Sequence, residues 1–140
     1  MNDTKSAKQI LDVIPRTMRI IRTELRALAK SELTVPQFRI LAHLTEGPLN
    51  NGQLADIQGV SVAAMSRMVD GLVRRELLTR TVGANDRRQT LLALTPSGRE
   101  TMDRITKAVQ KSLAERISKL STKPKKDLAS GLDALEEVFS

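Results

Sequence analysis

Residues 50–76 read NNGQLADIQGVSVAAMSRMVDGLVRRE, and two helix starts stand close together in them. Asn50 and Ser61 are residue types that cap helix N-termini, and Gly59 lies between the two caps. A short helix that ends at Gln58-Gly59, a tight turn and a second helix make a helix-turn-helix. The second helix carries a stripe of apolar residues that should face a core, namely Met65, Met68, Val69, Leu72 and Val73.

The segment before this stretch supplies a third small helix. Thr34 is a capping residue, and Gln37 stands where it can close a capping box. Pro36 is tolerated because it falls in the first helical turn. The helix is expected to stop at the Glu-Gly-Pro sequence of residues 46–48.

Beyond the helix-turn-helix, the sequence changes to a strand pattern. Residues 77–82 and 89–94 suit two β-strands, and the glycine-containing segment 83–86 suits the turn between them. Three small helices followed by a two-stranded wing predict a winged helix-turn-helix over residues 33–95.

Amphipathic helices flank this winged unit. Residues 8–30 carry apolar residues at spacings of three and four. Pro15 lies inside that pattern, where it should kink the helix or mark its true start. Thr95-Pro96 opens another helix with an apolar seam as far as residue 120, and a last helix follows a break at 121–124.

The expected fold class is therefore mainly α with a small β-hairpin wing, a winged helix-turn-helix flanked by N- and C-terminal dimerisation helices. In this interpretation residues 1–32 and 96–140 form the helical dimerisation region, and residues 33–95 form the DNA-binding domain. The apolar stripes of the flanking helices are too extensive for so small a winged domain to cover alone. A homodimer would cover them, and an intramolecular helical bundle is the alternative.

The composition restricts the classes of function. The chain of 140 residues has a net charge of +7 and a pI near 10.2, which favours an anionic partner, nucleic acid first and an acidic membrane surface second. It has no cysteine, which excludes disulfides, thiolate metal sites and thiol redox sensors, and fits a cytoplasmic protein. Its first residues lack the apolar core of a signal peptide, and no apolar run is long enough to span a membrane.

Aromatic residues are nearly absent, since Phe38 and Phe139 are the only two. Proteins that hold single-stranded nucleic acid usually stack its bases on aromatic faces. Duplex DNA is bound through backbone charge and base edges. The sequence therefore favours double-stranded DNA as the partner.

The second helix of the helix-turn-helix carries the residues expected to read DNA. Its N-terminal turns enter the major groove, where Ala63 and Ala64 suit contact with a thymine methyl. Ser66 suits a base edge or a phosphate, and Arg67 suits guanine or phosphate. Between residues 61 and 88 there are six arginines and no lysine, and a guanidinium fits both phosphate and guanine. The predicted contacts in this helix are Ser61, Ala63, Ala64, Ser66, Arg67, Arg74 and Arg75.

Some of these residues would be explained without DNA. Ser61 would cap its helix in any case. Arg74 and Arg75 stand near a helix C-terminus, where the macrodipole favours cations. Arg67 lies at the centre of the exposed face, which favours the functional interpretation.

The segment VGANDRRQTLLALT at 82–95 places three charges beside the wing turn. Asp86 is expected to pair with Arg88 and hold that side chain in one orientation. Arg88 is then expected to enter a narrow minor groove, whose negative potential attracts arginine. Arg87 is expected to contact a phosphate. The alternative is a solvated hairpin tip with no partner.

Residues 33–98 resemble the core of MarR-type bacterial transcriptional regulators. The most specific parts are Asp86-Arg87-Arg88 leading into LLALTPSG, and the segment SVAAMSRMVDGLVRREL. The order of these motifs and the flanking helices extend the resemblance over nearly the whole chain. The sequence departs from the family pattern at Gln58, where an apolar residue is usual. It also departs at the recognition tip, where two alanines replace more polar or proline-containing residues.

The resemblance implies a homodimer with interwoven terminal helices, bound to a pseudo-palindromic duplex site and most often acting as a repressor. It also implies a small anionic or phenolic effector bound between the dimerisation helices and the winged domain. Candidate residues for such a site are Arg16, Met18, Arg19 and His43. The family's peroxide sensors use a reactive cysteine, which this chain lacks.

Catalysis is not expected. The chain has a single histidine and shows no nucleophile elbow, no glycine-rich phosphate loop and no metal-ligand spacing. No catalytic residue, metal or cofactor is therefore predicted. Two other classes stay open: a non-specific architectural DNA-binding protein, which would bind any duplex with nearly equal affinity, and a basic helical protein-interaction module, which has no use for an arginine-tipped wing.

Overall fold

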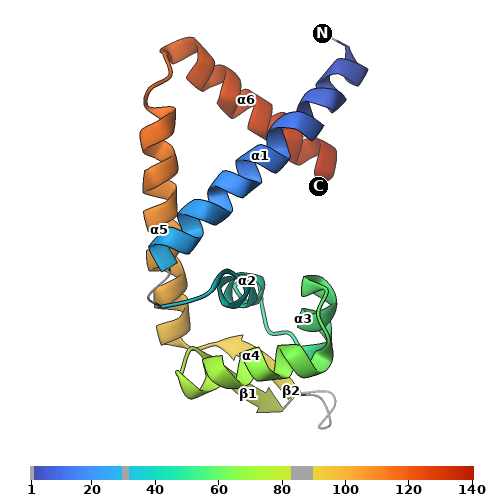
Figure 1. Cartoon of the computed structure of the whole chain (residues 1–140), viewed down its shortest axis with the longest axis vertical. Coiled ribbons are helices and arrows are strands. Elements are labelled where there is room, and N and C mark those ends of the chain that lie inside the picture. Colours follow the sequence, from blue (N-terminus) through green and yellow to red (C-terminus); the bar gives the residue numbers. More distant parts are fainter. Residues whose placement is uncertain (1, 30–31, 83–89) are drawn as a thin grey trace.

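The computed structural model describes residues 2–29, 32–82 and 90–140 (Figure 1). Its elements in chain order are α1 (Asp3–Ala29), α2 (Val35–Leu44), α3 (Asn51–Gln58), α4 (Val62–Arg74), β1 (Leu78–Val82), β2 (Thr90–Leu94), α5 (Pro96–Ile117) and α6 (Thr122–Phe139). The fold is mainly α with one antiparallel hairpin, which confirms the predicted fold class. Figure 1 shows α2, α3, α4 and the hairpin gathered at one end, the winged unit, while α1, α5 and α6 extend away from it.

Three helices of the winged unit begin with the caps expected from the sequence. Thr34 Oγ1 accepts the N–H of Gln37 at 3.3 Å, and the Gln37 side chain completes the capping box. Asn50 Oδ1 accepts the N–H of Gln53 at 2.8 Å in a second capping box. Ser61 Oγ accepts a backbone N–H of α4 at 3.0 Å. These caps fix where α2, α3 and α4 begin.

The hairpin is tied to the helices through its second strand. β1 pairs antiparallel with β2, with Leu78 opposite Leu94. The N–H of Leu49, in the connection between α2 and α3, donates to the carbonyl of Leu92 at 3.1 Å. The N–H of Leu92 donates back to the carbonyl of Leu49 at 2.7 Å. This bridge joins the wing to the base of the helix-turn-helix.

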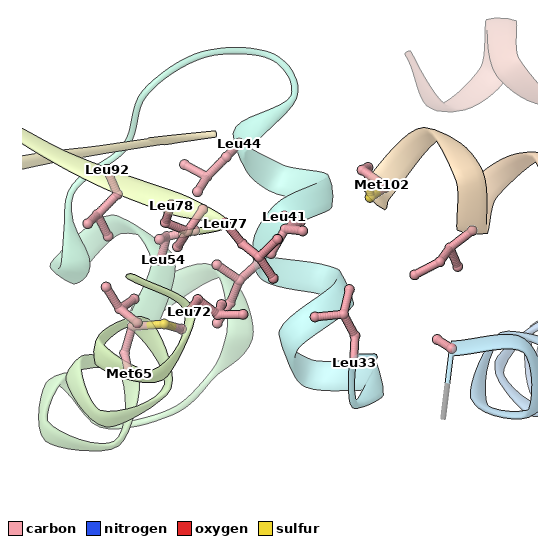
Figure 2. Packing of buried hydrophobic residues seen from close by; sticks show 14 of the residues in the cluster. Leu33, Leu41, Leu44, Leu54, Met65, Leu72, Leu77, Leu78, Leu92 and Met102 are labelled. Carbon is pink, nitrogen blue, oxygen red and sulfur yellow. The ribbon is translucent and has the colours of Figure 1, made fainter. Parts of the chain in front are cut away.

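The core fills the space between α2, α3, α4 and the hairpin. In Figure 2 the labelled side chains from all four elements point toward one another: Leu41, Leu44, Leu54, Met65, Leu72, Leu78 and Leu92. The predicted stripe on α4 is confirmed, with Met65, Val69 and Leu72 fully buried and Met68 and Val73 partly buried against the core. Met102 of α5 packs against this cluster from outside the winged unit.

α1 differs from the prediction at Pro15. The helix begins at Asp3 and includes Pro15, so proline does not mark its start, while a kink at Pro15, the other predicted outcome, stays a prediction. Figure 1 shows α1 as one helix. Proline removes the N–H that would bond the carbonyl four residues earlier, that of Leu11. Leu11 is 73% exposed, so water can satisfy its carbonyl. One residue on, Arg16 Nε donates to the carbonyl of Asp12 at 3.1 Å.

The connection between the last two helices also differs from the prediction. α5 ends at Ile117 and α6 begins at Thr122, so the break lies at 118–121 rather than at 121–124. Pro124 stands in the first turn of α6. Backbone N–H groups in a first turn have no helical partner, so a proline is tolerated there.

The flanking helices bury few of their apolar residues within one chain. Met102, Ile105 and Val109 of α5 are buried, but Ile117 and Leu120 farther along the same seam are each 40% exposed. α6, which the structure describes over its whole length, contains no buried residue. The single chain therefore does not bury α6 in an intramolecular helical bundle, which was the alternative to a dimer.

Candidate nucleic-acid interface

The turn between α3 and α4 is short and well fastened. Gly59 has a φ of +67°, a left-handed conformation that glycine adopts easily because it has no Cβ. The N–H of Val60 donates to the carbonyl of Ala55 at 3.0 Å and closes the end of α3. Asn51 Nδ2 donates to Ser66 Oγ at 3.2 Å and joins the two helices directly. α3 therefore holds α4 in one orientation.

α4 has a buried face and an exposed face that carries arginine. Met65, Val69 and Leu72 lie in the core. Arg67 and Arg74 are exposed and stand seven residues apart, two turns along one side of the helix. Of the other predicted contacts in and before α4, the exposed ones are Ser61, Ala63 and Arg75, and the half-buried ones are Ala64 and Ser66. The N-terminal turn thus offers small residues, and the side of the helix offers guanidinium groups.

Ser66 lies differently from the other predicted contacts. Its side chain is half-buried between α3 and α4, where its hydroxyl accepts the hydrogen bond from Asn51. The structure gives it a role in joining the helices. Its contact with DNA stays a prediction.

An ion pair beside the arginines was not foreseen from the sequence. Arg80 of β1 donates to the carboxylate of Asp70 on α4. Asp70 follows Arg67 by three residues and precedes Arg74 by four, so all three share one face of the helix. The pair neutralises a carboxylate between two arginines and ties the wing to α4. No local sequence pattern predicts this ion pair, because Asp70 and Arg80 belong to different elements.

Two exposed valines at the tip of α4 were also missed. Val62, the first residue of α4, is 55% exposed, and Val60 in the turn is 36% exposed. Neither falls on the core stripe, which is the signal that the sequence offered. A branched apolar side chain here suits the methyl group of thymine.

The wing residues Asp86, Arg87 and Arg88 lie outside the described residues. Their predicted pairing, phosphate contact and minor-groove contact therefore stay predictions. The described parts of the strands end at Val82 and Thr90, which are paired.

The structure does not bring the predicted effector residues together. Arg16, Met18 and Arg19 are exposed on α1, while His43 on α2 lines a separate hollow of about 450 Å³ beside Glu46. A larger cleft of about 650 Å³ lies between α1, α2 and α5. None of the four predicted residues lines this cleft. Its lining is mostly apolar and includes Ile21, Leu25, Phe38, Met102, Val109 and Leu113.

Three buried polar atoms lack a hydrogen-bond partner among the described residues, namely His43 Nε2, Asn51 Oδ1 and Gln58 Oε1. Gln58 is the position at which the sequence departs from the usual apolar residue. An unpaired buried carbonyl oxygen typically costs about 1–3 kcal/mol. The departure therefore leaves an oxygen at the end of α3 without a hydrogen-bond partner among the described residues.

Polar contacts fasten the N-terminal segment to α5. Arg116 Nη2 contacts Glu24 Oε1 at 2.7 Å, and Ser112 Oγ donates to Glu24 Oε2 at 2.8 Å. These hydrogen bonds, that of Arg116 first, lower the pKa of the Glu24 carboxyl below its ordinary value. Farther along, Arg104 Nη2 contacts Glu32 Oε1 at 2.7 Å. α1 and α5 are thus held together by charge as well as by apolar packing.

Two other kinds of feature are not found in the described part of the chain. No group of three or more histidine, aspartate or glutamate side chains there could hold a metal ion. Within the same residues, every helix is too short or too polar to cross a bilayer.

Known proteins resemble this chain in sequence. A model of the MarR family matches residues 33–90, which contain the helix-turn-helix and β1. The chain is 25% identical over 113 residues to YwaE of Bacillus subtilis (strain 168), an uncharacterized HTH-type transcriptional regulator. That match covers 80% of the chain and 66% of the relative, just under two thirds of its length.

Solved structures share the arrangement of the whole chain. The transcriptional regulator Tm0710 from Thermotoga maritima superposes with a TM-score of 0.82 at 24% identity, over 94% of both chains. A mutant of MepR from S. aureus, bound to an oligodeoxyribonucleotide, superposes with a TM-score of 0.68 at 18% identity, over 91% of this chain and 96% of that one. The chain therefore shares its fold with both of these solved structures.

Proposed function

We propose that this chain is a transcriptional regulator of the MarR family, which binds duplex DNA sequence-specifically as a homodimer and represses transcription. The exposed face of α4 carries the proposal. It combines small and apolar residues at the N-terminal tip with Arg67 and Arg74 behind them. A recognition helix in the major groove needs a slim tip that lets the backbone approach, and donors that follow it. The nucleotide-bound neighbour supports the same use of this fold.

Each part of the interface has a role in the proposal. Val62 and Ala63 contact thymine methyl groups, and Arg67 donates to guanine or to a phosphate. Arg74 and Arg75 hold phosphates and set the register of the helix. In the wing, which the structure does not describe at this point, Arg87 contacts phosphate and Arg88 enters the minor groove, oriented by Asp86.

The flanking helices support the homodimer. The apolar side chains of α6 are exposed in the single chain, with Leu132 at 54% and Phe139 at 70%. An open apolar space of about 480 Å³ lies between α1 and α6, lined by Ile10, Ile14 and Leu135 among others. A partner's helices would fill this space and cover both faces. Two-fold symmetry then places the half-sites about one helical turn, roughly 10 bp, apart.

The cleft between α1, α2 and α5 supports an effector site. It touches both the flanking helices and the winged unit, so an occupant can change how the two are set relative to each other. Among the lining residues, Thr106 and Gln110 supply the polar side chains. We therefore propose a largely apolar, neutral effector with one or two hydrogen-bonding groups, rather than a small anion.

Substitution of Arg67 tests the proposal. Arg67→Ala is expected to weaken binding to a selected operator by about 1–3 kcal/mol and to relax the base preference at one position. Binding is measured on the operator and on single-base variants of it. Arg26→Ala, which removes an exposed arginine from α1, serves as the matched control and should leave affinity and preference unchanged.

Three outcomes distinguish the alternatives. Uniform weakening on every sequence would make Arg67 a phosphate contact. Equal wild-type affinity for all duplexes would identify a non-specific architectural protein instead. Repression is checked with a reporter gene placed behind the operator, whose expression should fall when the chain is produced; a rise would identify an activator.

A further inference from the structure

The end of α4 and the start of α5 form one interlocked joint. The N–H of Thr95 donates to the carbonyl of Leu77 at 3.1 Å, and Thr95 Oγ1 donates to the carbonyl of Glu76 at 2.6 Å. The same hydroxyl oxygen accepts the N–H of Gly98 at 2.9 Å. The N–H of Leu77 in turn donates to the carbonyl of Leu72 in α4 at 3.0 Å. Hydrogen bonds thus run without a gap from α4 to the first turn of α5.

Gly98 lets the two backbones approach closely. It is buried, and a Cβ built on it would lie 2.1 Å from the carbonyl oxygen of Leu77 and 3.0 Å from the carbonyl carbon. Both atoms belong to the backbone, so no flexible side chain can turn aside to make room. Any larger residue at this position would push α5 away from the end of α4.

Glu76 adds a second constraint to the joint. Its φ of +61° is the left-handed conformation, which is unfavourable for a residue with a Cβ. α3 ends with glycine in the same conformation at Gly59, whereas α4 is followed by glutamate. The carbonyl of Glu76 accepts the hydroxyl of Thr95, which holds this strained residue in place.

We propose that this joint, built by Glu76, Thr95 and Gly98, sets the spacing between DNA half-sites that the dimer accepts. The inference rests on the proposed function, because spacing has meaning only for two winged units on one duplex. α5 leads from the joint into the flanking helices, and α4 leads from it to the recognition tip. Fixing the angle between α4 and α5 therefore fixes how far apart two recognition tips lie. These three are positioning residues that need not touch DNA.

The geometry makes spacing sensitive to small changes at the joint. α4 has 13 residues, so its N-terminal tip lies about 20 Å from its C-terminal end. A rotation of roughly 10° at the joint moves that tip by about 3.4 Å, the rise of one base pair. Added freedom of about 10°, or about 5° in each of the two protomers, would therefore let the dimer accept operators that are one base pair too long or too short.

A set of operators with identical half-sites and different spacings tests the proposal. The full-length wild type is expected to prefer one spacing. In Gly98→Ala, the ratio of affinities between the preferred spacing and spacings one base pair longer or shorter should fall by about tenfold, or the optimum should move to a new spacing. A tenfold change is the typical effect of one mismatched base pair. Ser97→Ala, an exposed residue in the same turn of α5, is the matched control and should keep the wild-type optimum.

A second pair of variants tests the joint even if Gly98→Ala fails to fold. Thr95→Val removes the hydroxyl that links Glu76 to Gly98 but keeps the branched shape. It should relax the spacing preference while affinity for an isolated half-site stays unchanged. Thr95→Ser restores the hydroxyl and should restore the wild-type preference. Wild-type spacing preference in both Thr95→Val and Gly98→Ala would overturn the proposal.

A distance measurement separates failure of the joint from failure of the proposed function. The chain has no cysteine, so spin labels can be placed through Asp56→Cys on α3 and Lys111→Cys on α5, both exposed positions. Labelled chains are diluted with unlabelled ones, and no DNA is needed. We expect one narrow distance distribution in wild type and a shifted or broader one in Thr95→Val; identical distributions would contradict a rigid joint. If the distributions differ but wild type binds no operator at any spacing, the proposed function fails and with it the role of the joint in spacing.

Discussion

The winged unit and the flanking helices bury their apolar residues in different ways. In the winged unit α2, α3, α4 and the hairpin close around a core in which Ile40, Leu54 and Leu72 are fully buried. α6 carries apolar residues at helical spacing as well, yet none of its described residues is buried in one chain. Apolar residues at helical spacing are therefore buried within the chain in the winged unit and left exposed in α6. The difference shows which part folds around itself and which part leaves its apolar residues exposed in the single chain.

The largest expected effect comes from opening the core of the winged unit. Leu72→Ala removes a fully buried side chain where α4 meets α2 and the hairpin, and should lower the free energy of unfolding by about 2–5 kcal/mol. Urea denaturation of the full-length chain measures this loss. A loss below about 1 kcal/mol would mean that the core is less tightly packed than the structure shows.

A similar truncation in α6 should act on assembly instead. Leu132 is 54% exposed in the single chain, and in the proposed dimer its burial would be worth about 2 kcal/mol per protomer. Leu132→Ala should therefore raise the dimer dissociation constant in sedimentation experiments. Ile57→Ala, which truncates a residue 47% exposed in the winged unit, should leave dissociation unchanged. A wild-type chain that sediments as a monomer would contradict the proposal that a partner covers α6.

The ion pair between the wing and α4 should have a smaller effect. Asp70→Asn removes the carboxylate charge that pairs with Arg80, and an ion pair this exposed contributes roughly 0.2–1 kcal/mol to stability. The lost negative charge on the proposed DNA-binding face would strengthen DNA binding if charge alone mattered. We expect weaker binding, because the wing is no longer tied to α4. Stronger binding by Asp70→Asn would show that the tie has no role in recognition.

The smallest effect is expected from Glu24, which joins α1 to α5. Because hydrogen bonds lower the pKa of Glu24 in the folded chain, its contribution to stability is present above the unfolded pKa and is lost as pH falls through the folded value. Glu24→Gln should therefore be slightly less stable than wild type near neutral pH and equal to it in acid. Denaturation curves at both pH values measure this, and a difference that grows in acid would contradict the assigned sign.

Features encoded by neighbouring residues can be predicted from the sequence. The caps at Thr34, Asn50 and Ser61 and the core stripe of α4 each depend on residues three or four apart. The hairpin follows from local pattern in the same way. The path of α1 through Pro15 does not follow from local pattern. The cost of the missing N–H depends on whether water reaches the carbonyl four residues earlier, and that exposure is decided by the fold.

Features made by distant residues could not be predicted. Asp70 and Arg80 meet only because the wing folds back on α4, and Gly98 looks like an ordinary helix-start residue until Leu77 is packed against it. The effector candidates rest on the resemblance and on residue type. The structure places the apolar cleft among other residues of α1, α2 and α5. A cleft between three elements has no signature within any one of them.

Selection of bound fragments from a random duplex library tests the central claim most directly. The full-length chain is incubated with the library at near-physiological salt, and the retained duplexes are sequenced. A dimeric, sequence-specific regulator should enrich one two-fold symmetric motif whose half-sites lie about one helical turn, roughly 10 bp, apart. Retention of duplexes without any enriched motif, or of single half-sites without a symmetric mate, would contradict it.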